Sequence, residues 1–285
     1  MTLLSNEKDI SVFLDGLDHP EGVTWGPDGF IYAGGEIGQI YRINIETKDV
    51  QELGRTNGFV LGMALDAKNN IYACDATNRS VYKITPEGSI SAYSTGTIDN
   101  PFGTPNYPAF DIDGNLYVAD SGDWEANNGC IYKIDSKGET CVWDTRLAQF
   151  PNGLCLGPDG DYLYVAMSLN EPRVARVKIE SDGSAGDTET VVELPNTVPD
   201  GLAFDSQGNL YIACYRPDRI YRLSSSGNLE ILGEDFQGTL MAAPTNVVFC
   251  GPNLGRMLSA NLGRWHLTEY QVGINGLPLN YPDLG

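Results

Sequence analysis

Short apolar runs that end in Leu-Tyr or Ile-Tyr recur along the chain at a nearly constant spacing. The tyrosine stands at positions 32, 72, 117, 164 and 211, and a degenerate sixth copy has Leu258 in its place. The spacings are 40, 45, 47, 47 and 47 residues. Periods of about 40–50 residues in β-rich sequence are typical of propeller blades. The pattern therefore predicts six repeats, each forming one blade.

Each repeat can be divided into four strands. In the fifth copy, an apolar run at 201–204 is followed by a turn at 205–208, the marker strand at 210–213, an alternating strand at 219–223 and an outer strand at 229–232. Asp and Gly in the turn supply its backbone angles and side-chain caps. The alternation of apolar and charged residues at 219–223 predicts a half-exposed strand. No long helical period appears, so the predicted class is all-β.

The outer strands predict how the ring closes. Five repeats have an outer strand. In the sixth repeat, the third strand (265–272) is followed only by a tail rich in Gly, Pro and Asn. The missing strand is supplied by the apolar run at 10–14, which we expect to complete the last blade. Closure of this kind leaves few sheet edges open to aggregation. The expected organisation is a single β-propeller domain over residues 1–285.

One residue stands just before the first strand of each repeat, and we call these six the ring residues: Glu21, Leu61, Asn106, Asn152, Asp200 and Thr245. First strands are innermost in a propeller, so the ring residues should converge at one end of the channel. Four of them carry carboxylate or amide oxygens, the donors that hard cations such as Ca²⁺ prefer. Taken singly, an Asn or Asp here is more often a backbone cap. Taken together, they predict one divalent metal ion, whose charge matches the two ring acids.

Calcium is the expected ion, and Fe²⁺, Zn²⁺, Mn²⁺ or Mg²⁺ on oxygen ligands stay open as alternatives. The chain has two histidines, His19 and His266, in different repeats, and no Cys/His cluster of the kind that binds structural zinc. His19 lies two residues before Glu21, near the expected channel mouth. It is a candidate substrate contact and an alternative base, although a packed loop imidazole is the commoner outcome.

Charge and cysteine usage restrict the partners. The net charge of −20 comes from 18 Lys and Arg against 38 Asp and Glu, and such a surface repels nucleic acid. No apolar stretch is long enough to cross a membrane, and no signal-peptide pattern appears, which predicts a cytoplasmic protein with no membrane partner. We expect a small-molecule substrate and a monomer or small homo-oligomer. The six cysteines are widely spaced, which favours free thiols over a disulfide framework.

The sequence resembles the senescence-marker protein/gluconolactonase family, which includes regucalcin and bacterial sugar lactonases. Three segments carry the resemblance: His19-Pro20-Glu21-Gly22, Phe150-Pro151-Asn152-Gly153-Leu154 and Val198-Pro199-Asp200-Gly201-Leu202. The resemblance implies a six-bladed propeller in which Glu21, Asn152 and Asp200 bind the metal. It also implies that Asp200 is the general base and that Asn106 contacts the substrate.

Thr104 stands where sugar lactonases of this family commonly have an arginine. We therefore expect weak activity on simple aldonolactones, with Thr104 lining the substrate site. Tyr107, Trp124, Tyr215 and Trp265 are aromatic candidates for the pocket rim and would suit a less polar ring.

The predicted activity is metal-dependent hydrolysis of a lactone, with the ion as Lewis acid and Asp200 as base. Strictosidine-synthase-like or lyase chemistry in the same pocket stays open, as does a non-catalytic scaffold with a structural ion.

Overall fold

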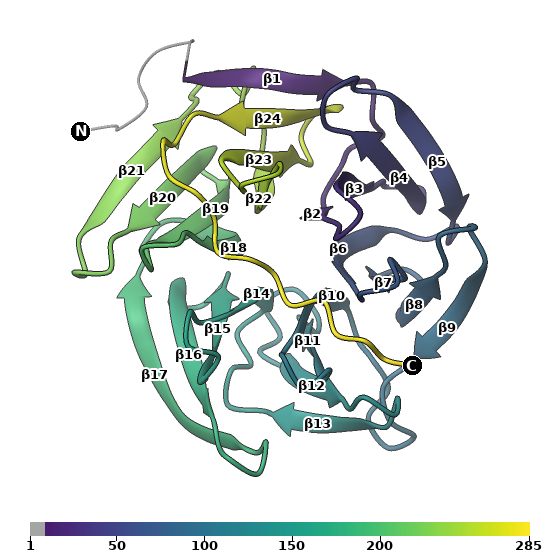
Figure 1. Ribbon diagram of the computed structural model, residues 1–285. Helices are drawn as coiled ribbons and strands as arrows, with labels where there is room; N and C mark the ends of the chain where they lie inside the picture. The colour runs from purple at the N-terminus through teal and green to yellow at the C-terminus, as the bar shows by residue number, and fades with distance from the viewer. Residues whose placement is uncertain (1–8) are drawn as a thin grey trace.

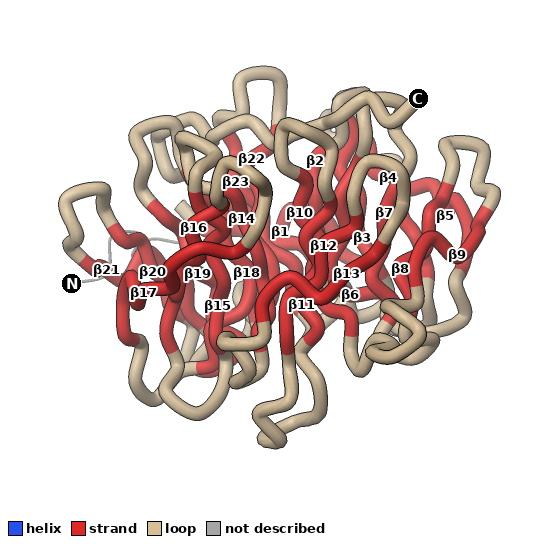
Figure 2. The backbone as a smooth tube through the Cα atoms, turned by 90° about the horizontal axis from the view of Figure 1, so that it is seen from below, coloured by secondary structure: helices blue, strands red, loops and turns tan. Residues whose placement is uncertain are grey.

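The computed structural model describes residues 9–285, which form six four-stranded antiparallel sheets arranged in a ring (Figure 1). This confirms the predicted six-bladed β-propeller. Residues 9–285 contain no helix, and the loops gather on two opposite faces of the ring (Figure 2). Within this range there is accordingly no helix of the length and apolarity that a membrane span needs.

The blades follow the chain order, and each runs from an inner to an outer strand. The first blade contains β2 (Val23–Trp25), β3 (Phe30–Gly34), β4 (Gln39–Asn44) and β5 (Val50–Arg55). The second contains β6 (Val60–Leu65), β7 (Ile71–Asp75), β8 (Ser80–Ile84) and β9 (Ile90–Ser94). The third contains β10 (Pro105–Phe110), β11 (Leu116–Asp120), β12 (Cys130–Ile134) and β13 (Thr140–Asp144).

The remaining blades have the same order. The fourth contains β14 (Pro151–Leu156), β15 (Tyr162–Met167), β16 (Arg173–Ile179) and β17 (Ala185–Glu193). The fifth contains β18 (Val198–Phe204), β19 (Leu210–Arg216), β20 (Arg219–Leu223) and β21 (Leu229–Glu234). The last contains β22 (Pro244–Cys250), β23 (Arg256–Asn261), β24 (His266–Tyr270) and the N-terminal strand β1 (Ile10–Asp15).

The N-terminal strand closes the ring as predicted. β1 pairs antiparallel with β24, with Ile10 opposite Tyr270 and Asp15 opposite His266. The last blade is therefore built from both ends of the chain, and Figure 1 shows β1 lying outside β24.

The turn between the first and second strands explains why an aspartate recurs there. In the fifth blade, Asp205 Oδ1 accepts hydrogen bonds from the backbone N–H groups of Gln207 and Asn209, both at 2.9 Å. Its Oδ2 accepts from Asn209 Nδ2 at 2.7 Å and from the hydroxyl of the marker Tyr211 at 3.1 Å. One carboxylate thus fixes the turn and anchors the next strand.

The marker tyrosines also join neighbouring blades. Tyr72 packs edge-on against Phe110, at the end of the first strand of the next blade, with ring centroids 5.1 Å apart. Tyr211 makes the equivalent contact with Phe249 at 5.1 Å. Such pairs add about 0.5–1.5 kcal/mol beyond their buried area, so the repeat that marks each blade also stabilises its junction with the next.

The C-terminal tail crosses the face on which the first strands end (Figure 1). It is held by hydrogen bonds to three different blades. The Leu277 N–H donates to the Phe204 carbonyl at 2.9 Å, Asn280 Nδ2 to the Phe110 carbonyl at 2.9 Å, and the Tyr281 hydroxyl to the Trp25 carbonyl at 2.7 Å. The tail is therefore a strap across this end of the channel.

The cysteines agree with the expectation of free thiols. All six lie within residues 9–285 and none is in a disulfide. Cys74, Cys214 and Cys250 are buried, whereas Cys141 is exposed on an outer strand.

Candidate metal centre and active site

A β-bulge marks the ring position in the first strand of five blades. In β14, Pro151 pairs with Met167 and Leu154 with Val165, so Asn152 and its neighbour Gly153 together face one partner residue. The other irregularities lie at the same place in β6, β10, β18 and β22. A bulge adds a residue and turns its side chain out of the regular alternation. The bulges therefore place the ring residues at one end of the channel.

The four polar ring residues predicted to bind the ion or substrate are all buried. Glu21, Asn106, Asn152 and Asp200 are only 3–5 % exposed. Buried carboxylates and amides need partners, because an unpaired polar atom loses its hydrogen bonds to water.

Several of their oxygens have no such partner. Among residues 9–285, seven buried side-chain nitrogen or oxygen atoms lack a hydrogen bond, and four of these are Oδ1 atoms of Asn106, Asn152, Asp200 and Asn246. Unpaired buried groups are rare in native proteins, and their concentration on neighbouring blades points to a missing ligand. Carboxylate and amide oxygens together are the donor set that Ca²⁺ takes.

Two serines fix the orientation of the ring amides. The Ser121 hydroxyl donates to the Pro151 carbonyl at 2.8 Å, so its single proton is used and it accepts from Asn106 Nδ2 at 3.0 Å. In the next blade, Ser168 donates to the Pro199 carbonyl at 2.6 Å and accepts from Asn152 Nδ2 at 3.2 Å. Each amide NH₂ is thereby committed to a serine, which leaves Oδ1 of Asn106 and Asn152 free for a cation.

The two ring acids act on each other. Burial raises the pKa of Glu21 well above its usual range, and the nearby Asp200 charge raises it further. Burial likewise raises the pKa of Asp200, and the Asn152 side chain opposes this in part. Two carboxylates in one dry site cannot both ionise readily without a compensating positive charge. A divalent cation would provide that charge.

Three residues of this site are not among the predicted metal ligands and substrate contacts. Asn246 follows the ring residue Thr245, while Ser121 and Ser168 directly follow the second strands of their blades. For the serines a signal existed, because the same residue type occupies the same repeat position twice, next to the two blades that carry ring asparagines.

His19 lies beside the ring but not in it. Its Nδ1 is 3.3 Å from Asp18 Oδ1 and 3.2 Å from Glu36 Oε2, and its ring centroid is 5.4 Å from that of Trp265. Asp18, His19 and Glu36 are close enough together to hold a metal ion. All three are at least partly exposed, so their polar atoms can be satisfied by water, unlike the orphaned oxygens of the ring.

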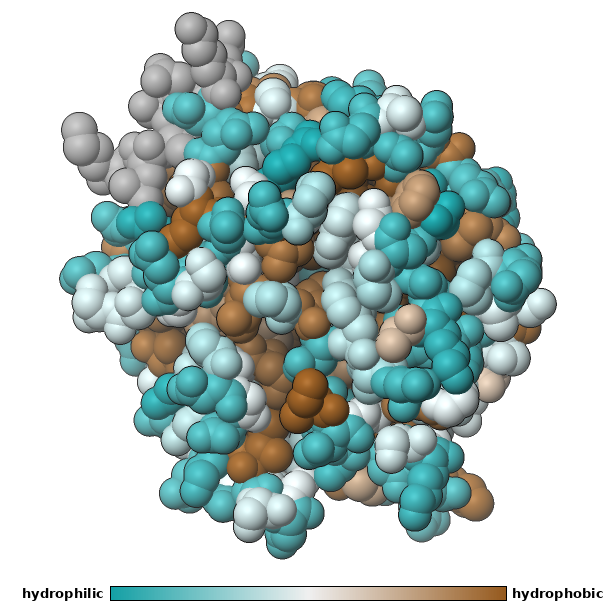
Figure 3. Space-filling view, in the orientation of Figure 1, coloured by the Kyte–Doolittle hydropathy of each residue, from teal (hydrophilic) through white to brown (hydrophobic). Residues whose placement is uncertain are grey.

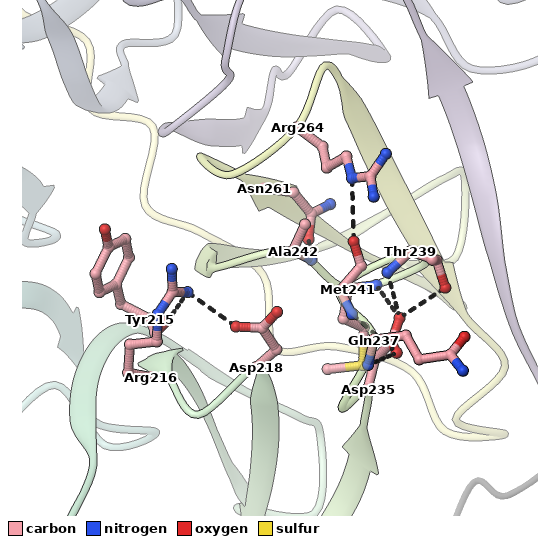
Figure 4. A network of polar contacts seen from close by, with 11 residues as sticks. Tyr215, Arg216, Asp218, Asp235, Gln237, Thr239, Met241, Ala242, Asn261 and Arg264 are labelled. Carbon is pink, nitrogen blue, oxygen red and sulfur yellow. Dashed lines mark hydrogen bonds and ion pairs between the residues drawn. The ribbon is translucent and has the colours of Figure 1, made fainter.

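Three other predicted substrate contacts, Thr104, Trp124 and Tyr215, lie on loops or at a strand end. Thr104 is half-buried, and its N–H donates to Asp120 Oδ1 at 2.7 Å. Trp124 is 57 % exposed and packs edge-on against Phe150, with centroids 5.0 Å apart. Tyr215 lies at the end of β19, and the Arg216 guanidinium carbon is 4.7 Å from the centroid of the Tyr215 ring (Figure 4).

The loop that leads into the last blade is held by one aspartate. Asp235 accepts hydrogen bonds from the backbone N–H groups of residues 237–241 and from the Thr239 hydroxyl (Figure 4). These backbone donors hold the pKa of Asp235 below its usual value, against the opposing effect of burial. Arg264 Nε donates to the Gly238 carbonyl at 3.1 Å, which fastens this loop to the loop after β23.

A cavity of about 420 Å³ runs along the channel from residues just past the ring, such as Tyr107 and Leu154, to the C-terminal tail. It is lined mainly by apolar side chains, including Leu65, Phe110, Leu156 and Phe204 at the ends of the first strands, and is roofed by residues 277–281. Figure 3 shows apolar residues at the centre of this face. Tyr107 lines this cavity rather than the outer rim. Its lining includes none of the four polar ring residues Glu21, Asn106, Asn152 and Asp200.

Comparison with known proteins agrees with this architecture. Residues 19–260 match the family described as SMP-30/Gluconolactonase/LRE-like region. Strictosidine synthase-like 3 from Arabidopsis thaliana is 30% identical over 176 residues, which cover 56% of this chain and 44% of that protein. The gluconolactonase of Zymomonas mobilis subsp. mobilis is 26% identical over 195 residues, which cover 60% and 52%. The chain thus matches about half the length of these relatives.

A solved structure shows the same fold over nearly the whole chain. Regucalcin, a calcium-binding protein from Agrobacterium tumefaciens, superposes with a TM-score of 0.79 at 17% identity, covering 96% of this chain and 97% of that one. The family match begins at the segment that contains Glu21 and extends into β23 of the last blade. The chain therefore belongs to the SMP-30/gluconolactonase/LRE-like family.

Proposed function

We propose that this protein is a metal-dependent hydrolase that opens a lactone ring, with Ca²⁺ as its ion. Glu21, Asn152 and Asp200 are the metal ligands of this proposal, and Asn106 contacts the substrate beside them. The observation that carries it is the group of orphaned, buried oxygens at the ring, joined to two acids whose combined charge balances one divalent ion. The gluconolactonase relative supports lactone as the substrate class.

The bound ion would act as a Lewis acid, polarising the lactone carbonyl and stabilising the negative charge that develops on its oxygen. Asp200 takes a proton from the attacking water, whose oxygen forms a bond to the carbonyl carbon. The ring C–O bond then breaks, and the departing alkoxide takes that proton back from Asp200, which gives the hydroxy acid and restores the Asp200 carboxylate. The serines hold the Asn106 and Asn152 amides, so these groups need no reorientation during the reaction.

A second candidate is a lyase or strictosidine-synthase-like reaction in the same pocket, which the Arabidopsis relative favours. A scaffold with a purely structural ion is the third. The relatives with sequence similarity to this chain include a gluconolactonase, which is an enzyme. We therefore favour an enzyme.

The test is a lactone panel assayed with metal-loaded protein, with chelator, and after calcium is added back. The panel would contain gluconolactone, aliphatic five- and six-membered lactones and an aromatic lactone. We expect hydrolysis of a less polar lactone, loss of this activity with chelator and its recovery with calcium. Activity on gluconolactone should be weak, because Thr104 has no positively charged group to bind the sugar hydroxyls. Activity that chelator does not affect, or hydrolysis of no lactone by loaded protein, would overturn the proposal. Gluconolactone as the best substrate would refute the inference from Thr104 alone.

A further inference from the structure

The junction between the last blade and the first differs from most of the other blade junctions at the ring. In most blades, the residue after the ring residue is a glycine: Gly22, Gly62, Gly153 and Gly201. A Cβ on Gly22 would lie 2.0 Å from the Leu61 carbonyl oxygen of the next blade, and a Cβ on Gly153 would lie 2.3 Å from that of Asp200. Glycine is required there because the next ring residue's carbonyl approaches so closely.

Asn246 occupies this position in the last blade, where the next ring residue is Glu21. Its Nδ2 donates to the Glu21 carbonyl at 2.9 Å and lies 3.2 Å from Glu21 Oε2. The neighbouring Thr245 hydroxyl donates to the same carbonyl at 2.6 Å. At this junction, side-chain hydrogen bonds therefore replace the glycine contact, and they hold both the backbone and the carboxylate of Glu21.

The other half of the Asn246 amide is unsatisfied. The residue is fully buried, and its Oδ1 has no hydrogen-bond partner among the described residues. With the NH₂ group directed at Glu21, Oδ1 is turned toward the fifth blade. It lies 2.7 Å from the position that a Cβ on Gly201, the residue after Asp200, would take. The amide thus lies between the segments that carry the two ring acids.

We infer that Asn246 belongs to the cation site: its NH₂ group positions Glu21, and its Oδ1 is a further oxygen donor to the ion. This inference rests on the proposed metal-dependent function. It adds a donor from the last blade to those from the first, fourth and fifth blades. Because Ca²⁺ takes 6–8 oxygen ligands, one more amide oxygen is within its usual coordination. The ion would then bridge the two ends of the chain at the point where the ring closes.

The experiment measures Ca²⁺ affinity by isothermal titration calorimetry of the full chain after removal of bound metal. Asn246→Ala removes both functions, and we expect the dissociation constant to rise about 10–100-fold. Asn246→Asp keeps an oxygen and adds a negative charge. We expect it to bind Ca²⁺ at least as tightly as the wild type, with a lower melting temperature in chelator because three buried acids then face one another.

Asn209→Ala is the matched control, because Asn209 is also buried and hydrogen-bonded but lies in the turn at the other end of the channel. It should lower the melting temperature and leave Ca²⁺ affinity unchanged. Glu21→Gln tests the site itself and should weaken Ca²⁺ binding strongly.

If Glu21→Gln weakens Ca²⁺ binding and Asn246→Ala does not, the inference is wrong. If Asn246→Asp binds more weakly than Asn246→Ala, Oδ1 is not a donor. If neither Glu21→Gln nor Asn246→Ala affects binding, the proposed ion site is itself wrong.

Discussion

Asp200 has two roles in the proposed chemistry, as ligand and as base, and one substitution separates them. Asp200→Asn keeps an oxygen donor and nearly the same shape, so the ion should still bind, although more weakly. Loss of a general base lowers turnover by about 10²–10⁴-fold. We expect a loss of this size when turnover is measured at saturating metal.

Asn152→Asp is the control for charge at the same ring, because it strengthens the ion's attraction without supplying a base at Asp200. Wild-type turnover by Asp200→Asn with its metal site filled would show that Asp200 is only a ligand. The base would then have to be another group, and His19 is the next candidate.

The metal-free ring acids should make stability depend on pH in a characteristic direction. Burial raises the pKa of Glu21 and Asp200 above their ordinary values of 4.5 and 3.8. For such a group, the stabilising contribution is complete below its unfolded-state pKa and is lost as the pH rises through the folded-state pKa. In chelator, the melting temperature of the wild type should therefore fall relative to that of Asp200→Asn as the pH rises from 4 towards neutrality.

Calcium should reverse this trend, since the cation favours the ionised pair. Differential scanning calorimetry of both proteins, with and without calcium, measures the effect. A difference between them that does not change with pH in chelator would contradict the assignment of these acids to one dry site.

The limits of sequence reasoning are clearest at Asn246. Pro244 aligns with Pro105, Pro151 and Pro199, so the alignment of the repeats assigns Thr245 to the ring. It gives no reason to select Asn246, the residue that follows. Whether that next side chain reaches Glu21 depends on the bulge in β22 and on the distance between the last and first blades. Neither quantity is encoded in the repeat spacing.

At the scale of the single strand, the glycine that follows four of the six ring residues allows the blades to approach one another. Gly153→Ala would place a Cβ 2.3 Å from the Asp200 carbonyl oxygen, so the fourth and fifth blades would have to move apart. Overpacking of this kind costs about 1–3 kcal/mol. We expect a lower free energy of unfolding in urea titration together with weaker Ca²⁺ binding, because Asn152 and Asp200 flank the strained contact.

Gly255→Ala is the control, because its Cβ would meet only the end of the Asn275 side chain, at 3.3 Å. It should change neither quantity appreciably. Equal behaviour of the two variants would mean that blade spacing does not determine the geometry of the ring.

The strands were predictable because their signals are local and recur from repeat to repeat, and the closing N-terminal segment was predictable because the sixth repeat lacks an outer strand. The marker tyrosines, the turn aspartates and the alternating third strands each have a direct physical role in their own blade. The position of Tyr107 was not predictable in the same way. Its neighbour Asn106 is a ring residue, and after the bulge in β10 Tyr107 lies just past the ring, where it lines the cavity.

Considered as a whole, the channel has a polar end at the ring and an apolar end under the C-terminal strap. Truncation after Gly273 removes the hydrogen bonds from Leu277, Asn280 and Tyr281, each contributing about 0.5–1.5 kcal/mol. The melting temperature should fall and the apolar cavity should bind a fluorescent hydrophobic dye. Ca²⁺ affinity should be unchanged, because the ring lies at the other end. A truncated chain that folds but loses Ca²⁺ binding would show that the two ends are coupled.

The central claim is that one cation binds at the ring, and anomalous X-ray scattering from crystals grown with Ca²⁺ tests it most directly. We predict a single strong peak within about 2.3–2.6 Å of side-chain oxygens of Glu21, Asn152 and Asp200. A peak at Asp18, His19 and Glu36 with none at the ring, or no peak under saturating calcium, would contradict the account.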